Sequence, residues 1–228
     1  MQGQKYGRDT EIVQHMRPEP MTAREEAAQA GIDDTEFEIF KHKMHMIALE
    51  GKETTMKLGA STAMRWGDVA FGIFTGQGDL SVCATGIYHH AVLGQIPIKY
   101  LIKHWVNEPS VGCKEGDSYF YNDPFYAGVH NADMGLSIPV FYKGTLLCFV
   151  GAAVHTGECG GSEPGGTVTA ARANMMRASS FRRSRSGELS TQGRSSEYAR
   201  GDEPRPAHDD PRYQGASCGS AYRGAAHS

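Results

Sequence analysis

Four polar residues beside apolar segments of the chain could together bind a metal ion: Asp123, His130, Asp133 and His155. Imidazole nitrogens and carboxylate oxygens suit a divalent zinc, manganese or ferrous ion. Such an ion, bound with open coordination positions, can activate water or polarise a substrate oxygen. The HxxD pattern of residues 130–133 is short and has many chance matches. The residues alone therefore leave two alternatives, a metal site or polar groups that satisfy backbone atoms at strand ends.

The segments that carry Asp133 and His155 are predicted to pair as a β-hairpin. GLSIPVFY and TLLCFVGAAVH flank a tight Lys-Gly turn at residues 143–144. A two-residue turn pairs positions whose numbers sum to about 287, which places Asp133 opposite Val154. A bulge, or a slip of one residue, would bring Asp133 and His155 to the same face. We therefore expect the two residues to meet at one end of the sheet, with His130 just beyond them.

A loop connects Asp123 to this hairpin. Asp123 follows the predicted strand SYFYN, and Pro124 and Gly128 lie between it and His130. These two residues are typical of turns. The loop could fold the Asp123 carboxylate back towards the same end of the sheet.

Upstream segments predict the elements that support the hairpin. Residues 22–25 form a capping box and predict a short helix that ends at Gly31. A longer helix follows Asp33 and continues through Gly51 in spite of the helix propensity of glycine. Residues 66–85 predict a second hairpin around GQGD, and residues 96–105 predict a helix that packs across a sheet. The apolar stripe of the long helix consists of Phe37, Phe40, Met44, Ile47 and Leu58.

Three further features of the sequence are weaker candidates for a role in binding or catalysis. One of His89 and His90 must point inward if the chain is extended there, although a core histidine is an equal alternative. The segment GECGGSEPGG could bind an oxyanion through its amides or be a flexible loop. Cys159 near His155 leaves a nucleophilic role open. No GxxxxGK[ST] pattern occurs, so the sequence predicts no ATP-binding loop of that type.

The composition is that of a globular protein, with 39% hydrophobic residues and a net charge of −3. The longest apolar run, residues 146–154, is much shorter than the roughly 20 residues that span a bilayer. Five cysteines without a CxxC pair favour a reducing compartment, and we expect the protein to be cytoplasmic. The expected architecture is α+β, with antiparallel hairpins packed against helices.

The chain contains five ordered motifs: YNDPFYAGVHNAD, IPVFYKGTLLCFVGAAVHTGECGG, SEPGG, TGIYHH and IKYLIKHW. Together these motifs resemble the hydantoinase B/5-oxoprolinase family, which includes the α-type subunits of acetone carboxylase and the corresponding subunits of acetophenone carboxylase. TGIYHH and IKYLIKHW are most similar to the carboxylase branch. The resemblance covers approximately residues 34–172.

The resemblance implies a set of site residues in this chain. Metal ligation is implied for His130, Asp133 and His155, and Asp68 is expected to take part in the metal site. Asp123 is expected to position water or a substrate oxygen, and His90 to relay protons or support the ligands. The ion would be zinc, manganese or iron.

The resemblance also implies partners and a reaction class. In the family an ATP-binding, hydantoinase A-like subunit activates the substrate by phosphorylation, and the metal-bearing subunit completes the reaction. The implied reaction is either hydrolysis of a cyclic amide (lactam) or carboxylation of a ketone. We therefore expect a hetero-oligomer that uses ATP only through its partner, with no nucleic acid or membrane among its partners.

The composition changes at about Ala173. Residues 173–228 contain one leucine, one phenylalanine and no valine, isoleucine or lysine, which is too little apolar surface to offset chain entropy. We expect disorder there, and our hypothesis is that a frameshift replaced the rest of a longer protein. A natural regulatory tail is one alternative, and an arginine-rich tail that binds nucleic acid is another, although acidic residues interrupt its basic charge.

The expected organisation has three parts. Residues 1–33 form an arm and a short helix, residues 34–172 form a truncated N-terminal part of the longer family fold, and residues 173–228 form the tail. The alternative to an active enzyme subunit is a catalytically inactive remnant that at most binds partner subunits.

Overall fold

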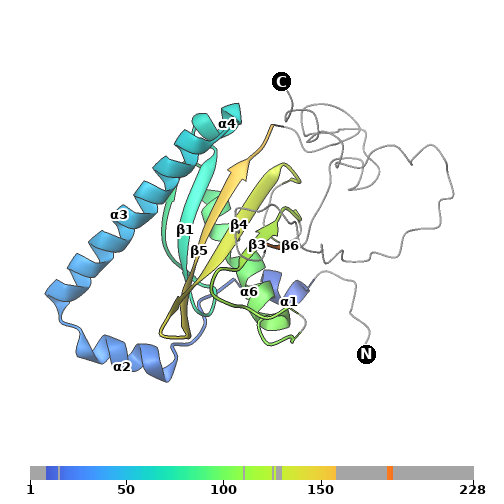
Figure 1. Cartoon of the computed structure of the whole chain (residues 1–228). Helices are drawn as coiled ribbons and strands as arrows, with labels where there is room; N and C mark the ends of the chain where they lie inside the picture. The colour runs from blue at the N-terminus through green and yellow to red at the C-terminus, as the bar shows by residue number, and fades with distance from the viewer. Residues whose placement is uncertain are drawn as a thin grey trace.

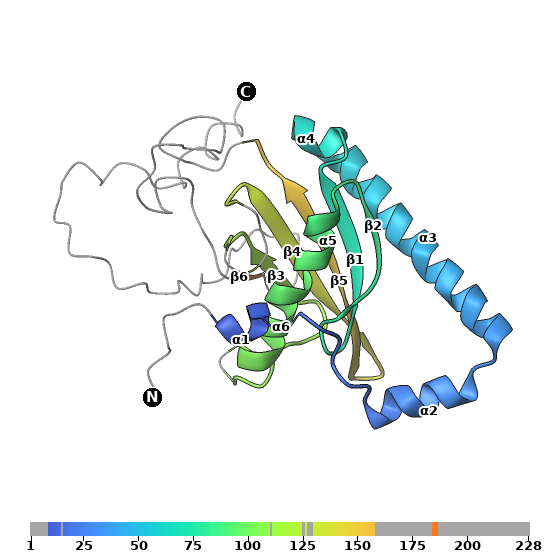
Figure 2. The same cartoon turned by 180° about the vertical axis from the view of Figure 1, so that it is seen from behind.

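The computed structural model describes residues 9–14, 16–109, 111–124, 126, 130–157 and 184–186. The fold is α+β, as predicted, with one antiparallel sheet in the strand order β2-β1-β5-β4-β3-β6 and helices on both faces (Figures 1 and 2). No described helix is both long and apolar enough to cross a membrane. The strands are β1 (Val69–Thr75), β2 (Leu80–Thr85), β3 (Ser118–Tyr121), β4 (Asp133–Tyr142), β5 (Thr145–His155) and β6 (Ser184–Ser186). The helices are α1 (Thr10–Gln14), α2 (Ala23–Gly31), α3 (Asp34–Leu58), α4 (Thr62–Arg65), α5 (Tyr88–Leu93) and α6 (Gln95–His104).

Capping residues begin helices α2 and α3 where the sequence predicts. The Thr22 side chain accepts the amide of Glu25, and the Glu25 carboxylate accepts the amide of Thr22, so the capping box is formed. Asp33 accepts the amides of Thr35 and Glu36 at 2.8 and 2.9 Å and caps α3. Each cap satisfies amides that have no partner within the helix.

Helix α3 packs on one face of the sheet through small residues. Ala48 is fully buried against Ile73 and Ala84, and a Cβ at Gly51 would lie 2.7 Å from the ring of Phe71. Glycine at position 51 therefore allows α3 to approach β1 closely, which outweighs its low helix propensity.

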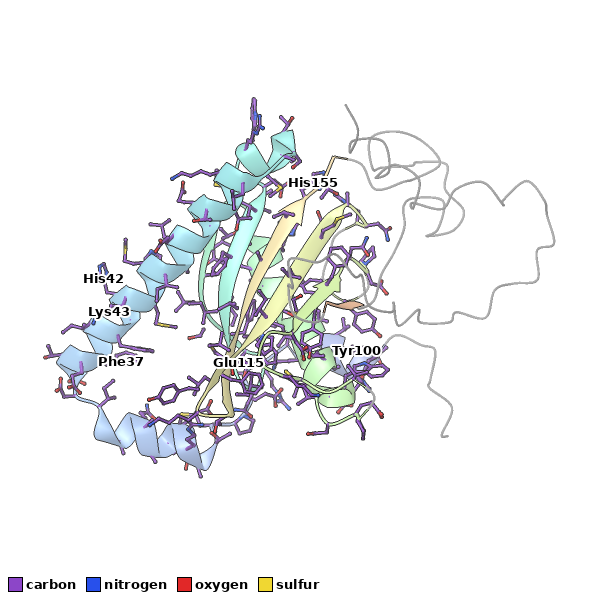
Figure 3. The ribbon with its side chains drawn as sticks, in the orientation of Figure 1. Phe37, His42, Lys43, Tyr100, Glu115 and His155 are labelled. Carbon is purple, nitrogen blue, oxygen red and sulfur yellow. The ribbon has the colours of Figure 1, made fainter. Side chains whose placement is uncertain are left out.

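The apolar stripe predicted for α3 is mostly not a core face, and this expectation was wrong. The first half of α3 diverges from the sheet, and the side chain of Phe37 is solvent-exposed (Figures 1 and 3). Only Met44 of the five stripe residues packs in the core beneath the helix. The members that are at least half exposed are Phe37, Phe40, Ile47 and Leu58.

Helix α6 covers the opposite face of the sheet, as predicted. Ile98 and Leu101 are buried against Phe74, Phe149 and Tyr119. This core fixes the face of β5 on which Phe149 lies. Because side chains alternate along a strand, that face also carries the side chain six positions later, which is His155.

The hairpin of β4 and β5 contains the register shift that the metal hypothesis needs. Lys143 and Gly144 have φ values of 50° and 76°, as a two-residue hairpin turn requires. Beside the turn Tyr142 pairs with Thr145, but a bulge follows at Val140/Phe141 and the register then moves by one residue. Asp133 consequently pairs directly with His155. Of the two irregularities that could bring Asp133 and His155 together, a bulge or a slip of one residue, the hairpin has the bulge, and it places the two residues on one face of the sheet.

Of the predicted tail, the structure describes only Ser184–Ser186, which form β6 and pair with β3. Strand β6 therefore lies in a segment for which the composition predicts disorder. Its backbone pairing with β3 explains this difference, because the edge of β3 can form backbone hydrogen bonds with a segment that has no apolar side chains. The remainder of residues 173–228 lies outside the described residues, so the disorder and frameshift expectations remain predictions.

Candidate metal centre

Asp133 lies at the centre of the site, on the first position of β4, and is 5% exposed. Its Oδ1 atom is 3.1 Å from His155 Nδ1 and 3.7 Å from His130 Nε2. The rings of the two histidines stand almost perpendicular, with centroids 4.7 Å apart. The structure therefore brings together three of the four residues that the sequence singled out, from the paired strands β4 and β5 and the turn before β4.

Local hydrogen bonds explain the spacing of the HxxD pattern. The backbone amide of His130 donates to Asp133 Oδ2 at 3.2 Å, and the amide of Asp133 donates to the carbonyl of His130 at 3.0 Å. The two bonds form a turn that keeps the Asp133 carboxylate next to the backbone of His130. Three residues of separation is the distance at which both bonds can close.

The end of β5 is tied down by neighbouring segments. The His155 amide donates to the carbonyl of Asp68 at 3.1 Å, and the Ser61 hydroxyl donates to the carbonyl of His155 at 2.9 Å. Thr156 donates its amide and its hydroxyl to the carbonyl of Ala132. These bonds fix the backbone on both sides of His155, and they bring Asp68 to the same end of the sheet.

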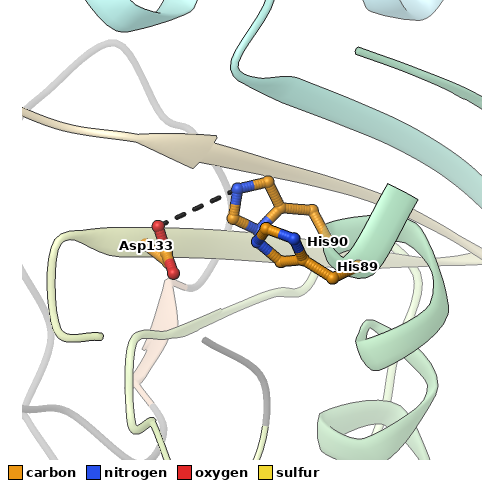
Figure 4. Close-up of side chains that lie close together, drawn as sticks. All are labelled: His89, His90 and Asp133. Carbon is orange, nitrogen blue, oxygen red and sulfur yellow. Dashed lines mark ion pairs between the residues drawn. The ribbon is translucent and has the colours of Figure 1, made fainter. Parts of the chain in front are cut away.

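Asp68 and His90 form a second pair beside Asp133. His90 Nε2 lies 2.9 Å from Asp68 Oδ1, and the His90 side chain is 1% exposed. The same nitrogen lies 3.8 Å from Asp133 Oδ1 (Figure 4). The prediction that one of the two histidines points inward assumed an extended chain, whereas this segment is helix α5; within that helix His90 is the buried residue of the two. His89 is exposed, with its ring 4.2 Å from that of His90.

Two groups of described residues place three potential ligand atoms within 4.8 Å of one another, and both include Asp133. The first is His130, Asp133 and His155, and the second is His89, His90 and Asp133. Ligand atoms about 2.1 Å from one ion lie roughly 3.0–3.5 Å apart in a tetrahedral site, close to the two distances from Asp133 Oδ1 in the first group.

Two histidine nitrogens at the site, other than the Nε2 atoms that lie near Asp133, lack a hydrogen-bond partner among the described residues. Nδ1 of His90 and Nδ1 of His130 are buried and have no hydrogen-bond partner within the described part of the chain. Such orphaned atoms are typical of sites that bind an ion or water. Burial lowers the pKa of His130, assisted by His155 and opposed chiefly by Asp133. The neutral imidazole, with a free lone pair, is the form that binds metal.

Asp123 belongs to neither ligand group. It is 4% exposed and follows β3, where the Asn122 side chain donates to the carbonyl of Asn131 at 3.0 Å. That bond holds the end of β3 next to the HxxD turn. The role predicted for Asp123 stays a prediction. The expectations for Cys159 and the glycine-rich segment fall outside the described residues, apart from Gly157.

The structure also has a pocket beside Asp68, which the sequence did not predict. This pocket has a volume of about 500 Å³ and opens to solvent. The tryptophan two residues before Asp68 is the aromatic residue of the pocket lining. The lining residues are Thr62, Ala63, Trp66, Gly67, Asp68, Gly86 and Ile87.

Comparison with known proteins gives one family and several relatives. Residues 33–182 match the model of the family described as hydantoinase B/oxoprolinase. The chain is 35% identical over 156 residues to the acetophenone carboxylase delta subunit of Aromatoleum aromaticum, covering 68% of this chain and 22% of that protein. It is 31% identical over 123 residues to the acetone carboxylase alpha subunit of Xanthobacter autotrophicus, covering 53% of this chain and 16% of that protein.

A solved structure shares the fold. The nucleotide-free structure of an acetone carboxylase aligns with a TM-score of 0.60 and 26% identity, over 66% of this chain and 20% of that chain. The chain thus spans about a fifth of the length of these relatives.

Proposed function

This chain belongs to the hydantoinase B/oxoprolinase family, and we propose that it carries the metal-binding part of a subunit of an ATP-dependent enzyme complex. The observation that carries the proposal is the convergence of His130 and His155 on the buried carboxylate of Asp133. The relatives named above are subunits of carboxylases, which supports a hetero-oligomeric assembly.

We assign the ion to His130, Asp133 and His155, with Asp68 as the adjacent carboxylate. Zinc, manganese and iron all accept this donor set. When bound, the ion would polarise a substrate oxygen or lower the pKa of a water molecule. Asp133 supplies negative charge from a buried position, and the neighbouring imidazoles are held in place by the strand pair and the HxxD turn.

His90 is proposed as the proton relay. If its Nε2 carries the hydrogen, Asp68 Oδ1 accepts it at 2.9 Å, and this pairing orients the ring beside Asp133. Imidazole titrates nearest to neutral pH and can take up or release a proton there. Asp123 is proposed to position water or a substrate oxygen.

The substrate is proposed to be a cyclic amide that is hydrolysed or a ketone that is carboxylated. Both substrates have a carbonyl oxygen that an ion could polarise, so the same residues would serve either reaction. A hydantoinase A-like partner subunit would bind ATP and activate the substrate, and the complex is proposed to be cytoplasmic.

Metal analysis of the purified full chain tests the proposal. The protein should bind close to one equivalent of zinc, manganese or iron after reconstitution, because a structural donor set of this kind binds metal tightly. Asp133→Asn and His155→Ala should each lower metal affinity by at least about 100-fold, more than is lost with outer-shell residues. His42→Ala is the matched control, because His42 is an exposed histidine on α3 away from His155 (Figure 3).

Two results would overturn the proposal. Metal content below about a tenth of an equivalent after reconstitution would favour an inactive remnant that at most binds partner subunits. Unchanged metal affinity in Asp133→Asn would place the ion elsewhere.

A further inference from the structure

We propose that the hydroxyl group of Tyr121 is a further catalytic group, which donates a hydrogen bond to a substrate oxygen at the metal centre. The inference rests on the proposed function, because it takes Asp133 and His155 to hold the ion. It goes further in adding a residue of β3 to the site. It also assigns the kind of atom that this residue binds, an oxygen that bears negative charge.

Tyr121 lies on the same face of the sheet as two of the proposed ligands. It pairs with Gly135 of β4, and Gly135 pairs with Ala153 of β5. Asp133 and His155 form the next pair on that face, two residues further along the same two strands. Since a strand rises about 3.3 Å per residue, these two rows of side chains are about 7 Å apart.

The Tyr121 side chain reaches across β4 because Gly135 has no side chain of its own. A Cβ on Gly135 would overlap the Cε2 and Cζ atoms of the ring and lie 2.6 Å from the hydroxyl oxygen. The hydroxyl group therefore lies over Gly135, on the face that carries Asp133. At a separation of about 7 Å, a single ligand atom between the two rows can contact both the hydroxyl group and the ion site.

The hydroxyl group of Tyr121 differs from those of the other two buried tyrosines among the described residues. Tyr119 donates to the carbonyl of Gly112 at 2.9 Å. Tyr126 accepts the backbone amide of Asp9 at 2.9 Å. No hydrogen bond joins the Tyr121 hydroxyl to any residue in the described part of the chain. The hydroxyl group of a buried tyrosine usually has a partner, so this one is available to a ligand.

The chemistry of this hydroxyl group suits a donor and not a base. Burial raises the pKa of Tyr121 above the ordinary 10, so the group keeps its proton at neutral pH. Attack of water on an amide, or removal of a proton beside a ketone, places negative charge on the carbonyl oxygen. A donor fixed in advance stabilises such a charge, and the Tyr121 hydroxyl would do so in either proposed reaction.

The position of the donor is fixed by the residue that follows it. The Asn122 side chain donates to the carbonyl of Asn131 at 3.0 Å, which ties the end of β3 to the turn before Asp133. The Tyr121 ring is held on the other side by its contact with Gly135. Donors held in this way need little reorganisation when charge develops beside them.

Binding of acetohydroxamate, a small oxyanion that chelates metal ions, tests the inference. We would titrate it calorimetrically into the full chain reconstituted with zinc, manganese or iron, whichever the chain retains. Tyr121→Phe should weaken acetohydroxamate binding about tenfold, because one hydrogen bond to a charged oxygen is lost. The metal affinity should stay within about threefold, because the hydroxyl group supplies no ligand to the ion. The urea midpoint should not fall, because the hydroxyl group has no partner to lose in the described part of the fold.

Tyr119→Phe is the matched control, because it removes a hydroxyl group from the same face of the same strand. It should lower the urea midpoint, since the carbonyl of Gly112 loses its donor, and it should leave acetohydroxamate affinity unchanged.

Three results would overturn the inference: no binding of acetohydroxamate to the metal-loaded chain, unchanged affinity in Tyr121→Phe, or a lower urea midpoint in that variant. Each of these with metal bound refutes only the role of Tyr121. A wild-type chain that binds no metal refutes the metal centre, and the role of Tyr121 with it.

Discussion

Gly135 lies two residues after Asp133 on the same face of β4, and replacing it by alanine should destabilise the fold sharply. Gly135 pairs with Tyr121 of β3, whose side chain is 5% exposed. A Cβ on Gly135 would overlap the Cε2 and Cζ atoms of Tyr121 and lie 2.6 Å from its hydroxyl oxygen. Carbon atoms normally approach to about 3.5–4.0 Å, so the ring would have to move by more than 1 Å.

The loss of stability expected for Gly135→Ala depends on which of two ways relieves the clash with Tyr121. If the Tyr121 ring rotates out of the core, the fold loses about 1.5–3 kcal/mol of burial. If the strands separate instead, overpacking strain of about 1–3 kcal/mol remains and ladder hydrogen bonds lengthen. We therefore expect Gly135→Ala to lower the free energy of unfolding by about 2–3 kcal/mol in urea denaturation followed by circular dichroism.

Two comparisons make this prediction specific. Gly157→Ala introduces the same methyl group where no non-adjacent residue of the described part of the chain lies within 4 Å, and it should change stability by less than about 0.5 kcal/mol. Gly135→Ala made in a Tyr121→Ala background should cost much less than it does alone, because the clashing ring is gone. The reasoning is refuted if Gly135→Ala costs less than about 0.5 kcal/mol, or costs the same in both backgrounds.

Two further predictions concern the charges that hold the N-terminal segment. Lys99→Met should lower the free energy of unfolding, measured in urea, by about 3 kcal/mol. The substitution removes the ammonium group that lies 2.6 Å from the nearly buried Asp79 carboxylate. A decrease of less than about 1 kcal/mol would contradict this prediction. Burial, the largest influence, raises the pKa of Asp9, but hydrogen bonds from His104 and Lys103 outweigh it and lower the pKa to about 2. The folded pKa lies below the ordinary 3.8, so this stabilisation is present above about pH 4 and is lost as pH falls towards 2. Asp9→Asn should remove about 1 kcal/mol at pH 7 and little at pH 2, and an equal effect at both pH values would contradict the assignment.

Much of the fold followed from local signals in the sequence. The capping residues of α2 and α3, the two hairpins and the amphipathic α6 all occur where the pattern predicts. The hairpin arithmetic also predicted that Asp133 and His155 would meet only if the hairpin had a bulge or a slip of one residue. It could not say where, because a bulge depends on how both strands pack against their neighbours.

Features that depend on tertiary packing were not predictable in this way. The face that α3 buries is set by Ala48 and Gly51, small residues that a hydrophobic pattern underweights. The Asp68–His90 pair joins residues 22 positions apart on a strand end and a short helix, and no periodicity connects them. The pocket beside Trp66 likewise arises from two loops that meet at glycines.

The bulge in the β4–β5 hairpin determines which residue of β5 lies opposite Asp133. Leu147 is the unpaired residue of the bulge, since Val140 pairs with Cys148 and Phe141 with Leu146. If Leu147 were paired and the ladder kept the register of the turn, Asp133 would face Val154, and the side chains of Asp133 and His155 would point to opposite sides of the sheet. One additional residue in β5 between the turn and the bulge would therefore separate a pair eight strand positions away, whereas deletion of Leu147 itself would leave Asp133 opposite His155 in a ladder without a bulge.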